Sequence, residues 1–314
     1  MKKNTGRYAP SPSGVMHVGN ISSSLLAWLD CKSLEGSLIF RIEDLDRDRC
    51  KSEYARKIAD DLQWLGIPWD EGWSEDRPEY AQSSRTMLYD EAFCFLQRKN
   101  LVYPCYCSRS RRLSAASAPH PGEQTSDNSC RCRYLSLTER SALENAGKRP
   151  AWKLKVPDKV ISFNDLHYGK ISENLSDGGD FIIRRSDGLY AYQLAVSVDD
   201  MTMGITRVVR GRDLLNSTPK QIWLISELGG TPPEYCHAPL LVSEDRRKMS
   251  KRYGDLSMEA LRERLEPEEI VGRLAGILGI TESSSPITAE ELVERFSWDK
   301  IPEDDIIFKD SEWL

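Results

Sequence analysis

The sequence lacks any long apolar run. No segment approaches the roughly 18 consecutive apolar residues that a membrane-spanning helix needs. The Met-Lys-Lys-Asn start leads into polar, structured-looking sequence rather than the apolar core of a secretory signal. These absences predict a cytosolic protein with no membrane partner. Internal repeats are absent as well.

A strong positive charge is also missing. The formal net charge is -6, which is unusual for a protein whose whole surface binds nucleic acid. Residues 256–314 hold 15 acidic and 6 basic residues, a balance of -9, whereas residues 1–255 balance at +3. The phosphates of an RNA partner are therefore expected to meet the body, because like charges repel. The alternative is that both values reflect only surface solubility.

The composition that remains is that of an ordinary globular protein. With 314 residues, 39% hydrophobic and 29% charged, the chain has material for one large domain or two to three smaller ones. In a chain without secretory character, cysteines are more often thiols or metal ligands than disulfides. The eight are Cys31, Cys50, Cys94, Cys105, Cys107, Cys130, Cys132 and Cys236.

The first 100 residues have the pattern of an α/β fold. Residues 6–14 are too rich in Pro, Ser and Gly for a helix and predict a loop. A helix over 18–34, a buried strand over 37–42 and two further helices around 54–65 and 87–96 follow from the apolar spacing. This order favours a parallel sheet. The carboxylates Glu43, Asp44 and Asp46 come just after the strand, where such sheets place ligands.

The later segments divide the rest of the chain. Residues 108–129 predict a loop, 136–146 a helix, 152–156 a strand, and 181–209 short apolar runs separated by turns. Helices are predicted over 219–228, 258–265, 268–278 and 289–296. We expect a catalytic domain in two halves, 1–100 and 191–255, an insertion over 101–190 and a helical tail over 256–314.

Two distant segments have residues suited to binding a triphosphate. They are PSPSGVMHVGN at 10–20 and RRKMSKR at 246–252. His17 and Gly19 at a helix start would let an imidazole and backbone donors approach phosphate oxygens. Lys248 and Lys251, with Ser250 on a mobile loop, would neutralise charge that develops on the α-phosphate and pyrophosphate. Either segment alone is weak, because a lone histidine is usually structural and a basic run is usually solvated.

Together and in this order, the two segments resemble the signature motifs of class I aminoacyl-tRNA synthetases. Five runs resemble the glutamyl branch, so the resemblance spans about residues 6–254. They are GRYAPSPSG at 6–14, FRIED at 40–44, YAYQLA at 190–195, VDD at 198–200 and VRGRDL at 209–214. The resemblance implies a Rossmann-like parallel sheet with a zinc-bearing insertion. It also implies ATP as substrate with Mg²⁺, the catalytic residues His17, Gly19, Lys248 and Lys251, and ATP contacts from His17, Asn20 and Lys251.

The resemblance further implies an L-glutamate pocket. The matching positions are Arg7, Ala9, Ser11, Glu43, Tyr192 and Arg210. Arginines suit the two carboxylates of glutamate and an acidic side chain suits its ammonium. Without the motifs, these residues would be interpreted as ordinary surface ion pairs.

The metal candidate is Cys105-x-Cys107 followed by Cys130-x-Cys132. Four thiolates in two close pairs suit tetrahedral zinc and would hold together an insertion with little core. The family usually completes a Cys-x-Cys pair with a later Cys and a Tyr or His, so this chain departs from the pattern. The alternatives are a pair of free surface thiols or a site with only two of these ligands. The nearby Arg109, Arg111, Arg112, Arg131 and Arg133 are candidates for tRNA contact or for solvated charge. Cys31, Cys50, Cys94 and Cys236 are interpreted as packing residues.

The acceptor is the least constrained part of the prediction. Only 62 residues follow Arg252, too few for the large anticodon-binding region of a glutamyl-tRNA synthetase. The chain therefore resembles the short paralogs that transfer glutamate to queuosine in the anticodon loop of tRNA(Asp), and a monomer is expected. In those paralogs the second signature is often eroded, yet KMSKR is intact here. The alternatives are a truncated enzyme that charges tRNA(Glu) at its 3′ end and a non-catalytic zinc-containing RNA-binding paralog.

Overall fold

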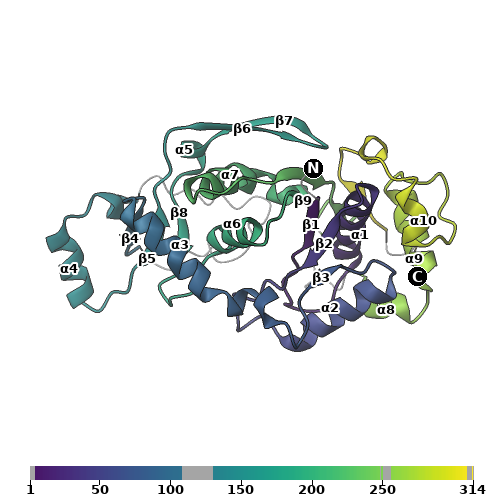
Figure 1. Ribbon diagram of the computed structural model, residues 1–314, viewed down its shortest axis with the longest axis horizontal. Helices are drawn as coiled ribbons and strands as arrows, with labels where there is room; N and C mark the ends of the chain where they lie inside the picture. The colour runs from purple at the N-terminus through teal and green to yellow at the C-terminus, as the bar shows by residue number, and fades with distance from the viewer. Residues whose placement is uncertain (1–3, 108–129, 248, 250–255, 310–312, 314) are drawn as a thin grey trace.

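The fold is built on a parallel sheet in the middle of the molecule (Figure 1). The computed structural model describes residues 4–107, 130–247, 249, 256–309 and 313. One part of the sheet has three parallel strands, in the order in which they pair: β1 (Thr5–Tyr8), β2 (Ser37–Phe40) and β3 (Glu71–Gly72).

The sheet continues on the other side of β1. The backbone N–H of Thr206 donates to the carbonyl of Thr5 at 2.9 Å, so the next strand lies beside β1. That strand is β9 (Arg207–Gly211), followed outward by β10 (Glu234–Ala238), β6 (Val160–Asp165) and the antiparallel β7 (Gly169–Asn174). The strand order thus reverses between β1 and β9. In α/β sheets, ligands bind outside the carboxyl ends of the strands at such a switch point.

Helices pack against the sheet through their buried apolar residues. In α1, Ile21, Leu25 and Leu29 are buried in the main core, and the helix ends before Gly36. A Cβ at Gly36 would lie 2.9 Å from the carbonyls of Asn4 and Cys31, so only glycine fits this turn into β2. The helices of this part are α1 (Val18–Ser33), α2 (Ser52–Trp64), α3 (Thr86–Arg98), α6 (Tyr192–Thr202) and α7 (Thr218–Glu227).

A second, antiparallel sheet lies at one end of the molecule, near α3 and α4 (Figure 1). Its strands are β4 (Val102–Cys105), β5 (Ala151–Leu154) and β8 (Phe181–Arg184). The helices between them are α4 (Leu137–Asn145), whose amino end is capped by Ser136 and Glu139, and the short α5 (Leu175–Gly178). The hairpin β6–β7 is part of the predicted insertion, yet β6 pairs with β10 of the main sheet. The predicted domain boundaries stay predictions.

The tail packs against the opposite end, beside α1 and α2 (Figure 1). The indole N–H of Trp298 donates to Asp30 of α1 at 2.6 Å. The tail elements are α8 (Met258–Arg262), α9 (Pro267–Ile277), α10 (Ala289–Val293) and β12 (Ile306–Ile307), which pairs with β11 (Leu241–Val242). Short 3-10 turns occupy Pro78–Tyr80, Gln82–Ser84, Arg131–Tyr134, Arg212–Ser217 and Trp298–Lys300. None of the helices in the described ranges is long and apolar enough to cross a membrane.

The predicted α/β fold is confirmed, but several elements were missed, among them β1, the hairpin β6–β7, β10 and α6. Residues 6–14 were predicted as loop, whereas β1 begins at Thr5 and ends at Tyr8. This strand is only four residues long and contains Arg7, so it has no apolar run to detect. The turns predicted over 181–209 were wrong for α6, because eight of its eleven residues are buried. A helix buried on nearly every side has no polar face to set a 3.6-residue period.

Candidate active site

The predicted pocket residues meet at the switch point. Arg7 lies near the end of β1, Arg210 near the end of β9, Glu43 just after β2 and Tyr192 at the start of α6. All four are buried. Burial raises the pKa of Tyr192, and the charges of Arg210, Glu43 and Arg7 all act on it. These four side chains, from four separate segments, therefore share one electrostatic environment.

The loop after β1 borders this cluster. The backbone N–H of Glu43 donates to the carbonyl of Pro10 at 3.0 Å, which holds the loop against the segment that follows β2. Ala9 is half-buried and Ser11 is exposed on either side of this contact. The two predicted loop residues thus lie beside the buried acid.

Arg7 is incompletely paired. Its Nη1 donates to the carbonyl of Val209 at 3.0 Å, and its Nε lies 3.7 Å from a carboxylate oxygen of Asp200. That Nε is buried and has no hydrogen-bond acceptor among the described residues. Burial lowers the pKa of Arg7. The negative charge of Asp200 acts to raise this pKa, and the neighbouring cations Arg41 and Arg210 act to lower it further. A bound carboxylate would relieve this strain on the cation.

Arg41 contacts Glu43 and shares Asp200 with Arg7, but it has more carboxylate partners than Arg7 has. It is fully buried and donates to Asp200 at 2.7 Å and to Glu43 at 3.1 Å, with Asp199 at 3.8 Å. Burial acts to lower the pKa of Arg41, but these carboxylates outweigh burial and hold it above its usual value. Burial raises the pKa of Glu43, and the positive charge of Arg41 acts in the opposite direction. Arg41 is thus compensated by acids of the protein and orients Glu43.

Arg210 is held entirely by neutral acceptors among the described residues. Its Nε donates to Nε2 of His237 at 3.1 Å, and its Nη1 donates to Gln221 at 2.8 Å. Its Nη2 donates to Thr218 at 2.7 Å and to the carbonyl of Leu214 at 3.4 Å. The guanidinium is fixed in direction, yet no carboxylate of the described chain pairs with it. A fixed, buried and uncompensated cation is suited to an incoming anion.

The predicted nucleotide-binding segment forms the start of α1. His17 is the N-cap residue of this helix, and its backbone N–H donates to Oδ1 of Asn20 at 3.2 Å. A Cβ at Gly19 would lie 3.2 Å from the His17 ring and 3.9 Å from the Cβ of Met249. The backbone N–H of Met258 donates to the carbonyl of Met16 at 2.9 Å. Met249 of the second motif and the segment that follows this motif therefore lie beside the first motif.

The lysines of the second motif lie outside the described residues. These are Lys248 and Lys251, together with Ser250. Met249 between them is described, and its side chain is buried in the main core.

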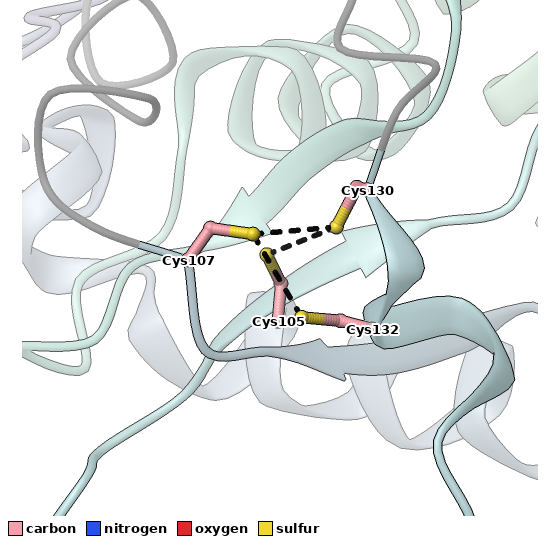
Figure 2. A group of neighbouring side chains, drawn as sticks. All are labelled: Cys105, Cys107, Cys130 and Cys132. Carbon is pink, nitrogen blue, oxygen red and sulfur yellow. Dashed lines mark hydrogen bonds between the residues drawn. The ribbon is translucent and has the colours of Figure 1, made fainter.

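The four predicted metal ligands converge at the end of β4 (Figure 2). Their sulfur atoms all lie within 4.8 Å of one another. The Cys105–Cys130 and Cys107–Cys130 pairs are 3.6 Å apart and the Cys107–Cys132 pair is 3.8 Å apart. Ligands of a tetrahedral zinc ion with bonds of about 2.3 Å are separated by about 3.8 Å. The four thiols therefore fit a zinc ion, and they do so without a Tyr or His ligand.

The other cysteines differ from one another. None of the eight, all of which are described, forms a disulfide. Cys31 and Cys236 are buried, as predicted for packing residues, and Cys50 is half-buried. Cys94 is exposed on α3, so the packing interpretation was wrong for it. The amphipathic pattern of α3 did not show on which side Cys94 lies, because cysteine occurs on both the buried and the exposed sides of helices.

Of the candidate RNA-binding arginines, two are described. Arg131 is exposed, whereas Arg133 is half-buried with Nη1 3.4 Å from Asp180. Arg109, Arg111 and Arg112 lie outside the described residues. Part of this predicted basic group is therefore tied to an acid of the insertion.

The comparisons with known proteins agree with this geometry. The model of the family "tRNA synthetases class I (E and Q), catalytic domain" matches residues 3–312. The chain belongs to this family. It is a ligase, as predicted, and its relatives support an activity like that of glutamate–tRNA ligases.

This class I synthetase has close relatives of similar length. The glutamyl-Q tRNA(Asp) synthetase of Symbiobacterium thermophilum is 43% identical over 96% of this chain and 94% of that protein. The enzyme of the same name from Nitratidesulfovibrio vulgaris is 43% identical over 95% of this chain and 93% of its own. The crystal structure of a glutamate–tRNA synthetase from Elizabethkingia anophelis matches with a TM-score of 0.81 at 25% identity, covering 99% of this chain and 69% of that one.

Several residues of this synthetase's site were given no role by sequence reasoning. Arg41, Asp199 and Asp200 lie within the runs that carried the family resemblance, so their positions but not their partners were visible. His237 and Asp165 had no sequence signal at all. Their importance comes from where β6, β9 and β10 place them in the sheet.

Proposed function

We propose that this class I synthetase activates L-glutamate with ATP and transfers the glutamyl group to queuosine in the anticodon loop of tRNA(Asp). The observation that carries the glutamate assignment is the arrangement of Arg7 and Arg210 around Glu43 at the switch point of the sheet. Zinc in the site of four cysteines and Mg²⁺ bound with ATP complete the proposal. Cytosolic location and a monomeric state stay predictions.

The charges of the pocket favour a dicarboxylic amino acid. Arg41 is already compensated by Asp200 and Glu43. Arg210 has only neutral partners, and the buried Nε of Arg7 has no acceptor among the described residues. Arg210, which has no carboxylate partner among the described residues, and Arg7, whose one acidic neighbour is Asp200 at 3.7 Å, are thus the cations proposed for the two carboxylates. Glu43 is the nearby acid for the ammonium group. Glutamine would leave one of these cations without an anion, which is costly in a buried site.

The proposed chemistry is adenylate formation followed by transfer. An oxygen of the glutamate α-carboxylate attacks the α-phosphorus of ATP in line, and pyrophosphate leaves. His17, Gly19 and Asn20 at the start of α1 would contact the phosphates and the nucleotide, and Lys248 and Lys251 would stabilise the charge that develops. A hydroxyl of the tRNA then attacks the glutamyl carbonyl and displaces AMP. The protein contributes positioning and electrostatics.

The queuosine acceptor is supported by the relatives. Two proteins named glutamyl-Q tRNA(Asp) synthetase are 43% identical over more than nine tenths of both chains. The acceptor is therefore tested separately from activation.

Activation is tested by ATP–pyrophosphate exchange with glutamate, glutamine and aspartate, with and without tRNA. Of the three amino acids, only glutamate is expected to support exchange. Exchange with glutamine at an equal rate would contradict the pocket assignment, and no exchange with any amino acid alongside retained tRNA binding would favour a non-catalytic RNA-binding paralog.

Transfer is tested with radiolabelled glutamate and separate purified tRNAs. Label is expected on queuosine-containing tRNA(Asp) and not on the same tRNA lacking queuosine. Label on tRNA(Glu) alone would show instead a truncated enzyme that charges the 3′ end.

A further inference from the structure

We propose that His237 and Asp165 are positioning residues that hold Arg210 in the orientation and charge state required to bind a substrate carboxylate. This inference rests on the proposed glutamate pocket and deepens it. Neither residue is among the predicted substrate contacts. Both would act through Arg210.

The three residues lie side by side on three neighbouring strands. Arg210 of β9 and His237 of β10 are register partners, and Asp165 ends β6 on the far side of β10. Nδ1 of His237 lies 2.6 Å from Oδ2 of Asp165, and Nε2 lies 3.1 Å from Nε of Arg210. Neither His237 nor Asp165 is exposed by more than 1%. A buried chain of hydrogen bonds therefore runs from the end of β6 to the pocket.

The carboxylate of Asp165 fixes which imidazole nitrogen carries the proton. Its Oδ1 accepts three backbone N–H groups, from His167 at 3.1 Å, Tyr168 at 3.0 Å and His237 at 3.3 Å. Its Oδ2 is thereby aimed at Nδ1 of the ring, which must be the donor because an ionised carboxylate only accepts. Nε2 then presents a lone pair to the N–H of Arg210. The tautomer follows from the hydrogen bonds on both sides of the ring.

A neutral acceptor can orient Arg210 without compensating its positive charge, whereas a carboxylate acceptor would compensate it. Burial lowers the pKa of His237 to about 4, and the positive charge of Arg210 lowers it in the same direction. The ring is therefore neutral near pH 7 and orients Arg210 without cancelling its charge. Arg41, in the same pocket, differs in this respect. Carboxylates orient its guanidinium and also compensate its charge.

Further contacts restrict Arg210 to one orientation. Its guanidinium carbon lies 5.2 Å from the centre of the Tyr235 ring, which is nearly parallel to the His237 ring at an interplanar angle of 11°. Thr218 accepts from Arg210, and its oxygen lies 3.2 Å from Nε2 of His237. His237 thus connects Asp165 to both Arg210 and Thr218 through the two nitrogens of its ring.

Asp165→Asn tests the tautomer directly. The amide oxygen of asparagine can keep the three backbone donors of Oδ1, which places its NH₂ group opposite Nδ1. The ring must then carry its proton on Nε2 and point a donor at the Arg210 N–H. His237→Leu removes the acceptor altogether, whereas His237→Gln keeps an oxygen within reach of Arg210. The matched control is Asp70→Asn, a carboxylate that accepts from Leu38 at the amino end of β2, away from the pocket.

The measurement is ATP–pyrophosphate exchange at varied glutamate and varied ATP. We expect Asp165→Asn and His237→Leu to raise the KM for glutamate by at least about tenfold, the scale of one charge-assisted hydrogen bond. The KM for ATP should stay within about threefold, and His237→Gln should recover part of the loss. Nitrogen NMR of the imidazoles should show the ring proton on Nδ1 in the wild type and on Nε2 in Asp165→Asn. The chain has only four histidines to assign.

The outcomes separate this inference from the proposed function. A wild-type protein without glutamate-dependent exchange would contradict the proposed function itself. An active wild type with a folded Asp165→Asn variant whose glutamate KM is unchanged would overturn the positioning role. Equal rises in the KM for glutamate and ATP, matched by Asp70→Asn, would overturn it as well, since they indicate a general loss of structure.

Discussion

The glutamate pocket and the cysteine cluster are both assembled from distant segments, but by different means. In the pocket, Arg7, Glu43, Tyr192 and Arg210 are fixed by strands and helices with an extensive apolar core on either side. Around the four thiols, the described apolar neighbours are Tyr103, Tyr106 and Leu135. A packed sheet can hold buried charges in place, whereas a segment with so little apolar core needs a cross-link such as a bound metal ion.

The two regions should therefore fail differently when they are perturbed. Damage to the pocket should change glutamate activation in a folded protein. Loss of the thiol cluster should loosen one end of the molecule and leave activation largely intact. Four predictions test this contrast.

The largest expected effect is that of Arg210→Ala. Removing the uncompensated cation should lower kcat/KM for glutamate in pyrophosphate exchange by about a thousandfold, the scale of breaking a buried charge pair. The control is Arg207→Ala on the same strand, which pairs with Asp30 rather than with the pocket. Folded Arg207→Ala protein should stay within about threefold of the wild type in exchange, although the loss of the largely buried pair with Asp30 should lower its stability. Comparable losses in both variants would contradict the assignment.

Lys251→Ala tests the nucleotide end of the same site. Glutamate-dependent exchange should fall by about two orders of magnitude, the usual scale for removing a charge contact made in the transition state. Lys170→Ala, an exposed lysine of β7, serves as the control. Wild-type exchange in Lys251→Ala would remove this lysine from the catalytic role.

The third prediction concerns stability against pH. Burial lowers the pKa of His237 to about 4 from 6.5, so the unfolded chain binds more protons between these values. Stability that is fully present above about pH 6.5 should be lost as pH falls towards 4, by about 2–3 kcal/mol. Chemical denaturation of the wild type and His237→Gln at several pH values measures this. An equally steep decline in the variant would assign it to other groups.

The smallest expected effect comes from Cys130→Ser, which removes one thiol of the cluster. Bound zinc, measured by elemental analysis, should fall, and transfer to tRNA should drop by about tenfold because the insertion loses its cross-link. Pyrophosphate exchange should stay within about threefold. Cys94→Ser, a change at an exposed thiol, should change none of these three quantities. Exchange that fell together with transfer would show that the two regions are coupled.

The sequence predicted the parts of the site that are local or that carry a family pattern. The helix start at His17, the pairing of Cys105-x-Cys107 with Cys130-x-Cys132 and the parallel sheet followed from spacing and composition. The first strand and α6 escaped because neither has the alternation that marks a half-buried element. Arg7 within β1 is buried beside Asp200 of α6 and donates to the carbonyl of Val209 of β9.

What the sequence by itself determined is which chemical groups are available and in what order. The tertiary structure decided which of three buried arginines remain open to a substrate. Arg41 and Arg210 look alike in the sequence, yet one meets carboxylates and the other meets His237, Gln221 and Thr218. The physical reason is strand register, since Asp165, Arg210 and His237 are far apart in the chain and become neighbours only when β6, β10 and β9 pair.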